Sequence, residues 1–172
     1  IKAARLNDNI QLDIISYVPE HYAELVDSAP GVNIHEAKYS RAEIWDKFMQ
    51  HADVLLLPTY VESFGMVALE ALSFGMAIIA TDIYALPEMV NKKNGALISP
   101  PIEIWKDYLA FGLHFRLNDI AEVVRSLDTE VFENNLADEI CKLARSKEAL
   151  FLARQASVTL FKERFISNAP TC

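Results

Sequence analysis

Two glutamates flank the start of an apolar segment near the middle of the chain. Seven residues separate Glu62 from Glu70, and Gly65 lies between them. The segment from Gly65 to Phe74 (GMVALEALSF) is apolar at nearly every position except Glu70. A helix of this composition is expected to be enclosed by protein, where an unpaired carboxylate is costly. Glu70 is therefore expected to have a partner or to contact a ligand.

The backbone at the start of this segment could bind an anion. The N–H groups of Gly65, Met66 and Val67 would have no partner within a helix that begins here, and the helix dipole adds to their attraction for negative charge. A glycine at this position would let a phosphate approach the backbone closely. Glu70, about one turn further on, could accept hydrogen bonds from the vicinal hydroxyls of a ribose. Glu62 would face the group beyond the phosphates.

The spacing of the two acids alone leaves a second interpretation open. Glu62 would then be a solvated loop residue, and Glu70 would be a carboxylate whose hydrogen bonds come from a neighbouring backbone. In that case neither side chain would contact a ligand.

The segments on either side of the two acids predict a strand, a loop, a helix and a second strand. Asp53–Pro58 (DVLLLP) is a short apolar run closed by proline, which is typical of a strand buried on both faces. Thr59–Ser63 is polar and predicts a loop. Gly75 is placed to end the helix as its C′ residue, and Ala77–Thr81 predicts the next strand.

The chain up to residue 100 alternates between predicted strands and helices. Ser40 followed by Glu43 has the spacing of a capping box, which indicates a helix start. Strands that alternate with helices predict an α/β fold with a Rossmann-like parallel sheet covered on both faces, and ligands of such sheets bind outside the carboxyl ends of the strands. The remaining predicted elements are strands at Gln11–Tyr17, Val32–His35 and Ala96–Ser99, and helices at Pro19–Ser28, Ser40–His51 and Leu86–Val90.

The alternation stops after residue 100. Pro100–Arg116 is dense in aromatic residues and is interpreted as a packed segment, with a contact surface for a missing domain or a second copy as the alternative. Helices are predicted at Asn118–Leu127, Glu133–Arg145 and Lys147–Phe165. The last of these carries an apolar stripe that is assigned to the core, namely Phe151, Val158, Phe161 and Phe165.

The composition is that of an ordinary globular domain, and together with the absent motifs it argues against several classes of protein. The 172 residues have a net charge of −8 and no basic run longer than Lys92-Lys93, which argues against nucleic-acid binding. Two cysteines, Cys141 and Cys172, provide neither a disulfide framework nor metal-ligand spacing, which favours a reduced, cytoplasmic protein. The sequence has no P-loop, no G-x-G-x-x-G, no G-x-S-x-G and no H-E-x-x-H, and no apolar run of about eighteen residues. We therefore expect no metal, no cofactor and no transmembrane segment.

The stretch from Glu62 to Glu70 (ESFGMVALE) resembles the E-x(7)-E signature of retaining, nucleotide-sugar-dependent glycosyltransferases of the GT-B fold, group 1 or family 4. Residues 51–58 (HADVLLLP) and 75–82 (GMAIIATD) resemble the strands on either side of that signature, although Met76-Ala77 stands where proline is common. LPEMV at 86–90 and NGALISP at 94–100 resemble two further family motifs. The resemblance covers roughly residues 10–100.

The resemblance implies glycosyl transfer from a nucleotide-diphosphate sugar, which is a substrate and not a cofactor, to an acceptor with retention at the anomeric carbon. It implies that Glu62 positions the donor sugar as the catalytic-site residue and that Glu70 binds the ribose hydroxyls. The loop formed by Glu36, Ala37 and Lys38 would contact the nucleobase. The remaining donor-binding residues implied by the resemblance are Ser63, Phe64, Gly65, Met66 and Val67.

The resemblance also implies that this chain is one domain of a longer enzyme. Residues 1–172 would form one domain, the C-terminal half of a GT-B fold, with a nucleotide-sugar-binding core at 10–100 and a helical extension at 101–172 packed on it. The domain that binds an acceptor saccharide, lipid or protein would be missing, so the fragment would be inactive alone. The family's diphosphate-binding arginine and lysine are not matched, because Lys2 and Arg5 lack that motif context. The full-length enzyme would be cytoplasmic or peripheral to a membrane.

Two alternatives stay open at this point. One is a nucleotide-sugar epimerase with a related GT-B fold, which the E-x(7)-E match disfavours. The other is a nucleotide-sugar-binding or interaction module without catalysis.

Overall fold

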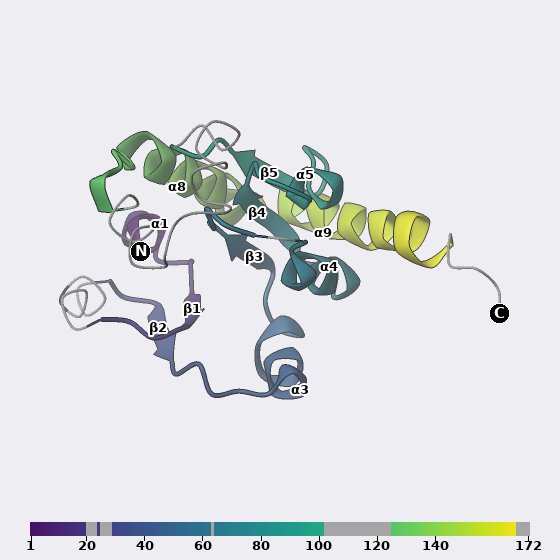
Figure 1. Cartoon of the computed structure of the whole chain (residues 1–172), viewed down its shortest axis with the longest axis horizontal. Coiled ribbons are helices and arrows are strands. Elements are labelled where there is room, and N and C mark those ends of the chain that lie inside the picture. Colours follow the sequence, from purple (N-terminus) through teal and green to yellow (C-terminus); the bar gives the residue numbers. More distant parts are fainter. Residues whose placement is uncertain (20–23, 25–28, 63, 102–124, 168–172) are drawn as a thin grey trace, which may run out of the picture.

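The computed structural model describes residues 1–19, 24, 29–62, 64–101 and 125–167 (Figure 1). The predicted helix Pro19–Ser28, the aromatic segment Pro100–Arg116 and the predicted helix Asn118–Leu127 fall wholly or largely outside these residues. Among the residues described, none of the helices combines the length and the apolar character that a membrane span requires.

The residues that the structure describes form five parallel strands in two hydrogen-bonded groups (Figure 1). Strand β1 (Leu12–Ile15) pairs with β2 (Val32–His35), with Leu12 opposite Val32. A second sheet has the order β3-β4-β5. All pairings are parallel, as predicted, but the described residues show two ladders and not one continuous sheet. The strands of the second sheet are β3 (Val54–Leu57), β4 (Ala77–Thr81) and β5 (Gly95–Ile98), each within one residue of its predicted position.

The core forms where helix α4 (Met66–Ser73) packs on strand β4. All five residues of β4 are buried, as expected for the central strand of a covered parallel sheet. Its other face packs against α8 (Glu130–Arg145), where Phe132 contacts Ile79 and Ile98. The prediction that β3 is buried on both faces is wrong, since its four residues are only half-buried. The physical reason is that β3 is an outer strand of the three-stranded sheet.

Two helix boundaries predicted from single residues are confirmed. Ser40 caps helix α3 (Arg41–Ile44) in a reciprocal capping box with Glu43, and the helix continues as the π-helical turn η2 (Trp45–Met49). Hydrogen bonds from the backbone and side chain of Ser40, together with Lys47, lower the pKa of the Glu43 carboxyl to about 2. At the end of α4, Gly75 has φ +67° and closes a Schellman motif.

The C-terminal helix α9 (Lys147–Phe161) is attached to the amino ends of β3 and β4. Arg154 donates a hydrogen bond to the Gly75 carbonyl at 2.9 Å and forms an ion pair with Asp53. The Ser157 hydroxyl, which is fully buried, donates to the Met76 carbonyl at 2.6 Å. These contacts hold α9 against the edge of the sheet opposite to the carboxyl ends of the strands.

The prediction that the whole apolar stripe of this last helix belongs to the core is wrong for Phe151, whose side chain is 58% exposed. Phe161 and Phe165 do pack against the core, because they lie on the turns that follow Ser157. The helical geometry ends as the π-helical turn η3 (Lys162–Ile166). Two short helices complete the described elements, α1 (Lys2–Leu6), which packs on α8, and α5 (Leu86–Met89).

Candidate functional site

Helix α4 begins at the carboxyl edge of the three-stranded sheet. Gly65, its N-cap residue, is buried against Leu86 of α5, and α5 follows the carboxyl end of β4 after a short loop. The hydroxyl of Thr81, the last residue of β4, is fully buried and has no hydrogen-bond partner among the described residues. The start of α4 and the end of β4 therefore lie at the edge where parallel α/β sheets bind ligands.

Gly65 is required for packing, which the sequence did not indicate. Its φ is +79°, a conformation that side chains rarely adopt, and a Cβ there would lie 2.7 Å from the Leu86 Cδ2 atom and 3.4 Å from the Met89 Cε atom. The missing side chain thus makes room for α5. The approach of a phosphate to the backbone of the same glycine stays a prediction.

We expect Gly65→Ala to lower the free energy of unfolding by about 1–3 kcal/mol, because alanine is strained at positive φ and its Cβ would displace Leu86. Urea denaturation followed by circular dichroism measures this loss. Met66→Ala, at an exposed position one residue on, is the matched control and should change stability by less than about 0.5 kcal/mol. Equal free energies of unfolding for the two variants would contradict the packing role of Gly65.

The Glu70 carboxylate is partnered on both of its oxygens. The Trp45 indole N–H donates to Oε2 at 3.0 Å, and the Arg41 guanidinium forms an ion pair with Oε1. The carboxylate therefore has side-chain partners from α3 and η2, in place of the backbone partner considered from the sequence. The expectation that a carboxylate in this helix needs a partner is confirmed.

Arg41 and Trp45 reach Glu70 from the same face of one helical segment. They are four residues apart, as are Glu70 of α4 and its C-cap residue Phe74, so two i,i+4 pairs face each other. The Arg41 guanidinium lies 4.8 Å from the centre of the Trp45 ring, and that ring lies 6.0 Å from the Phe74 ring. The indole thus contacts both a cation and an aromatic ring.

The other residues implied to bind a donor lie around the start of α4. Glu62 is half-buried in the loop before the helix, while Phe64 and Met66 expose their side chains. Val67 is half-buried in the first turn. Ser63 lies outside the described residues. The expected full enclosure of α4 is wrong at its start, because Met66 is 51% exposed at the open edge of the sheet.

The loop Glu36-Ala37-Lys38 follows the carboxyl end of β2 and is exposed. Glu36 and Lys38 form an ion pair at 2.7 Å. Their hydrogen bond lowers the pKa of the Glu36 carboxyl and raises the pKa of the Lys38 ammonium, so both side chains are charged at neutral pH. Helix α3, which carries Arg41, begins just after this loop.

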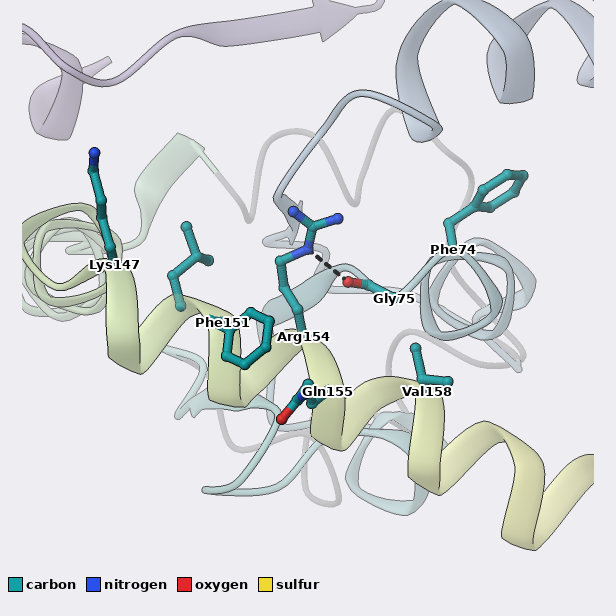
Figure 2. A pocket seen from close by; sticks show the side chains of 8 residues that line it. Phe74, Gly75, Lys147, Phe151, Arg154, Gln155 and Val158 are labelled. Carbon is teal, nitrogen blue, oxygen red and sulfur yellow. Dashed lines mark hydrogen bonds between the residues drawn. The ribbon is translucent and has the colours of Figure 1, made fainter.

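A groove of about 440 Å³ lies at the opposite end of α4 (Figure 2). Figure 2 shows Phe74 and Gly75 on one side of it and Phe151, Arg154 and Val158 of α9 on the other. The eight residues of α4 make roughly 12 Å of helix between this groove and the helix start. The groove is therefore separate from the start of α4.

The sequence indicates the two glutamates as candidate site residues but does not indicate Arg41 and Trp45. The available signal was their spacing of four residues directly after the capping Ser40, which places both on one helix face. That spacing does not indicate which element the face will meet. Within the described ranges, no three side chains of His, Cys, Asp or Glu gather as they would around a metal ion.

The sequence model of one protein family, glycosyl transferases group 1, matches residues 1–116, which is more than half of this 172-residue chain. The chain belongs to this family. The predicted group is thereby confirmed, while the retaining mechanism and the family 4 assignment remain predictions.

Two known glycosyltransferases are similar to this chain over part of their length. An uncharacterized glycosyltransferase of Methanocaldococcus jannaschii is 30% identical over 100 residues, covering 56% of this chain and 25% of the relative. A D-inositol 3-phosphate glycosyltransferase of Corynebacterium diphtheriae is 35% identical over 96 residues, covering 52% of this chain and 22% of the relative. The matched regions thus span about a quarter of these relatives or less.

A solved structure confirms the predicted fold class, an α/β fold with a Rossmann-like parallel sheet of the GT-B kind. The pneumococcal O-GlcNAc transferase GtfA, solved in complex with UDP and GlcNAc, superposes with a TM-score of 0.65 at 17% sequence identity. The superposition covers 94% of this chain and 28% of that one.

Proposed function

We propose that this group 1 chain is the donor-binding domain of a retaining glycosyltransferase, which moves a sugar from a nucleotide-diphosphate sugar to an acceptor. The observation that carries the proposal is the start of α4 at the carboxyl edge of the sheet, with a glutamate one turn into the helix whose carboxylate is held in a fixed orientation. A diphosphate at a helix start and a ribose beside it is the arrangement that such an edge favours.

Each part of the donor would have its own contacts. The N–H groups of Met66 and Val67 would bind the diphosphate, and those around Phe64 and Gly65 would contact the sugar. Glu70 would accept hydrogen bonds from the ribose hydroxyls, as the family resemblance implies. Ser63 would belong to the same group of donor contacts, and the loop Glu36-Ala37-Lys38 would lie against the base.

The reaction depends on the charge that develops on the leaving diphosphate. As the bond between the anomeric carbon and the diphosphate oxygen breaks, negative charge builds on that oxygen, and preorganised N–H donors stabilise it where water is excluded. The proposed transfer needs no metal ion. Glu62 would orient the sugar ring so that the acceptor attacks on the retained face.

The donor-binding domain would be one part of a longer protein. Residues 10–100 would bind the donor, residues 101–172 would form a helical extension on that core, and a further domain outside this chain would bind an acceptor saccharide, lipid or protein. Without that domain the chain would be inactive. We place the protein in the cytoplasm or at the surface of a membrane.

Thermal unfolding of the chain with UDP-glucose, GDP-mannose and ADP-glucose tests the proposal. At a concentration of 100 times Kd, a ligand that binds only the folded chain adds about 2.7 kcal/mol of stability. We expect one of the three to raise the melting temperature, and its nucleoside monophosphate to raise it less, because the monophosphate lacks the second phosphate. Stabilisation by none of them, or equally by the monophosphate, would contradict a nucleotide-diphosphate-sugar site.

A further inference from the structure

The Glu70 carboxylate receives one strong donor on each oxygen. Trp45 Nε1 donates to Oε2, and the Arg41 guanidinium is paired with Oε1. The Glu70 side chain is only 16% exposed, whereas Arg41 is 60% exposed. Trp45 is half-buried, and the Arg41 guanidinium approaches Glu70 from the solvent side.

These two donors leave part of the carboxylate available. An ionised carboxylate has about four lone-pair sites, and an indole N–H and a guanidinium can donate but cannot accept hydrogen bonds. One bond to each oxygen thus leaves roughly two acceptor sites. A vicinal diol presents two O–H donors, so the remaining capacity of Glu70 matches the two hydroxyls of a ribose.

The two donors also fix the direction in which the free lone pairs point. Trp45 contacts the Arg41 guanidinium, 4.8 Å from its ring centre, and the Phe74 ring at 6.0 Å. A side chain held by its neighbours restricts the rotation of the group that it hydrogen-bonds. The Glu70 carboxylate is thereby set before any ligand arrives.

Stability alone does not explain why Arg41 forms an ion pair with Glu70. The Arg41 side chain is 60% exposed, and an ion pair that reaches solvent typically contributes little to stability. Arg41 lies in the first turn of α3, just after the loop Glu36-Ala37-Lys38 that follows the carboxyl end of β2, and its partner Glu70 lies in the second turn of α4. A function in recognition is consistent with that position.

We propose that Arg41 and Trp45 are positioning residues, which orient the Glu70 carboxylate to accept both hydroxyls of a nucleotide ribose and thereby set the preference for ribonucleotides. This inference rests on the proposed function, because it takes Glu70 as the ribose contact. It adds two residues that the E-x(7)-E stretch does not contain.

Calorimetric titration of the 172-residue chain with UDP, GDP and ADP, and with their 2′,3′-dideoxy counterparts, tests the inference. For the diphosphate that binds most tightly, we expect Trp45→Phe and Arg41→Met each to weaken binding roughly five- to tenfold and to leave the dideoxy ligand unchanged. Arg41→Lys should restore part of the loss. The ratio of the two affinities is measured within one variant, so it does not depend on equal stability of the variants.

Lys47→Met is the matched control. Lys47 lies on the same helical segment, contacts the Tyr39 ring at 4.9 Å and pairs with Glu43, so it repeats the chemistry of Arg41 away from Glu70. Its removal should leave the ribose preference intact. In a Trp105→Phe background, Trp45 is the chain's single tryptophan, and its emission should change with the ribonucleotide and not with the dideoxy ligand.

The possible outcomes distinguish the positioning role of Arg41 and Trp45 from the proposed ribose contact of Glu70. A ribose preference that is present in the native chain and unchanged in both variants overturns the positioning role alone. Tighter ribonucleotide binding by Arg41→Met also overturns it, because Arg41 would then compete with the diol. If the native chain shows no ribose preference, the proposed role of Glu70 fails and this inference fails with it.

Discussion

Glu62→Ala is expected to lower the turnover of a full-length enzyme containing this chain by roughly 100-fold or more, while nucleotide binding persists. The reason is that Glu62 would contact the sugar and not the nucleotide, and loss of orientation at the reacting centre costs rate more than affinity. Turnover with the nucleotide sugar that stabilises the chain, measured together with the Kd of the matching nucleoside diphosphate, separates the two effects.

Glu62→Gln and Glu148→Ala serve as controls for this result. Glutamine keeps the hydrogen-bonding shape of the side chain and should recover part of the activity, whereas the exposed Glu148 of α9 should be replaceable without loss. Turnover of Glu62→Ala close to that of the native enzyme would remove Glu62 from the site.

Glu70→Ala is expected to weaken the binding of a nucleoside diphosphate to this chain by about 1–3 kcal/mol, the usual cost of leaving hydrogen-bonding groups without partners. Inorganic pyrophosphate should bind the variant as it binds the native chain, because it carries no ribose. Calorimetric titration with both ligands measures the difference.

The same substitution also removes the partner of Trp45 and Arg41, so the stability of the variant must be followed separately. Urea denaturation provides that measurement, and binding is then compared only at temperatures at which both proteins are folded. An unchanged affinity for the nucleoside diphosphate would show that the Glu70 carboxylate serves the contact between α3 and α4 and not a ligand.

Local signals in the sequence were sufficient for much of the fold. The capping box at Ser40 and Glu43 and the C′ glycine at Gly75 depend on a few neighbouring residues, and both are confirmed. The apolar runs that predicted β3, β4 and β5 also depend on local composition, and their positions are correct to within one residue.

Features set by tertiary contacts could not be predicted in the same way. The exposure of Phe151 depends on how Arg154 and Ser157 attach α9 to the sheet, and the need for glycine at position 65 depends on where Leu86 lies. The pairing of Glu70 with Arg41 joins residues 29 positions apart. The sequence predicted that Glu70 needs a partner, because burial of a carboxylate requires one, but periodicity does not identify which side chain provides it.

The most direct test of the account is to follow the backbone amides of the chain by ¹⁵N–¹H correlation spectroscopy during titration with a nucleoside diphosphate. The account predicts that the N–H signals of Met66 and Val67 at the start of α4 shift most, together with the Trp45 indole N–H next to Glu70. Largest shifts at the other end of that helix, around Gly75 and Arg154, with Met66 and Val67 unmoved, would contradict it.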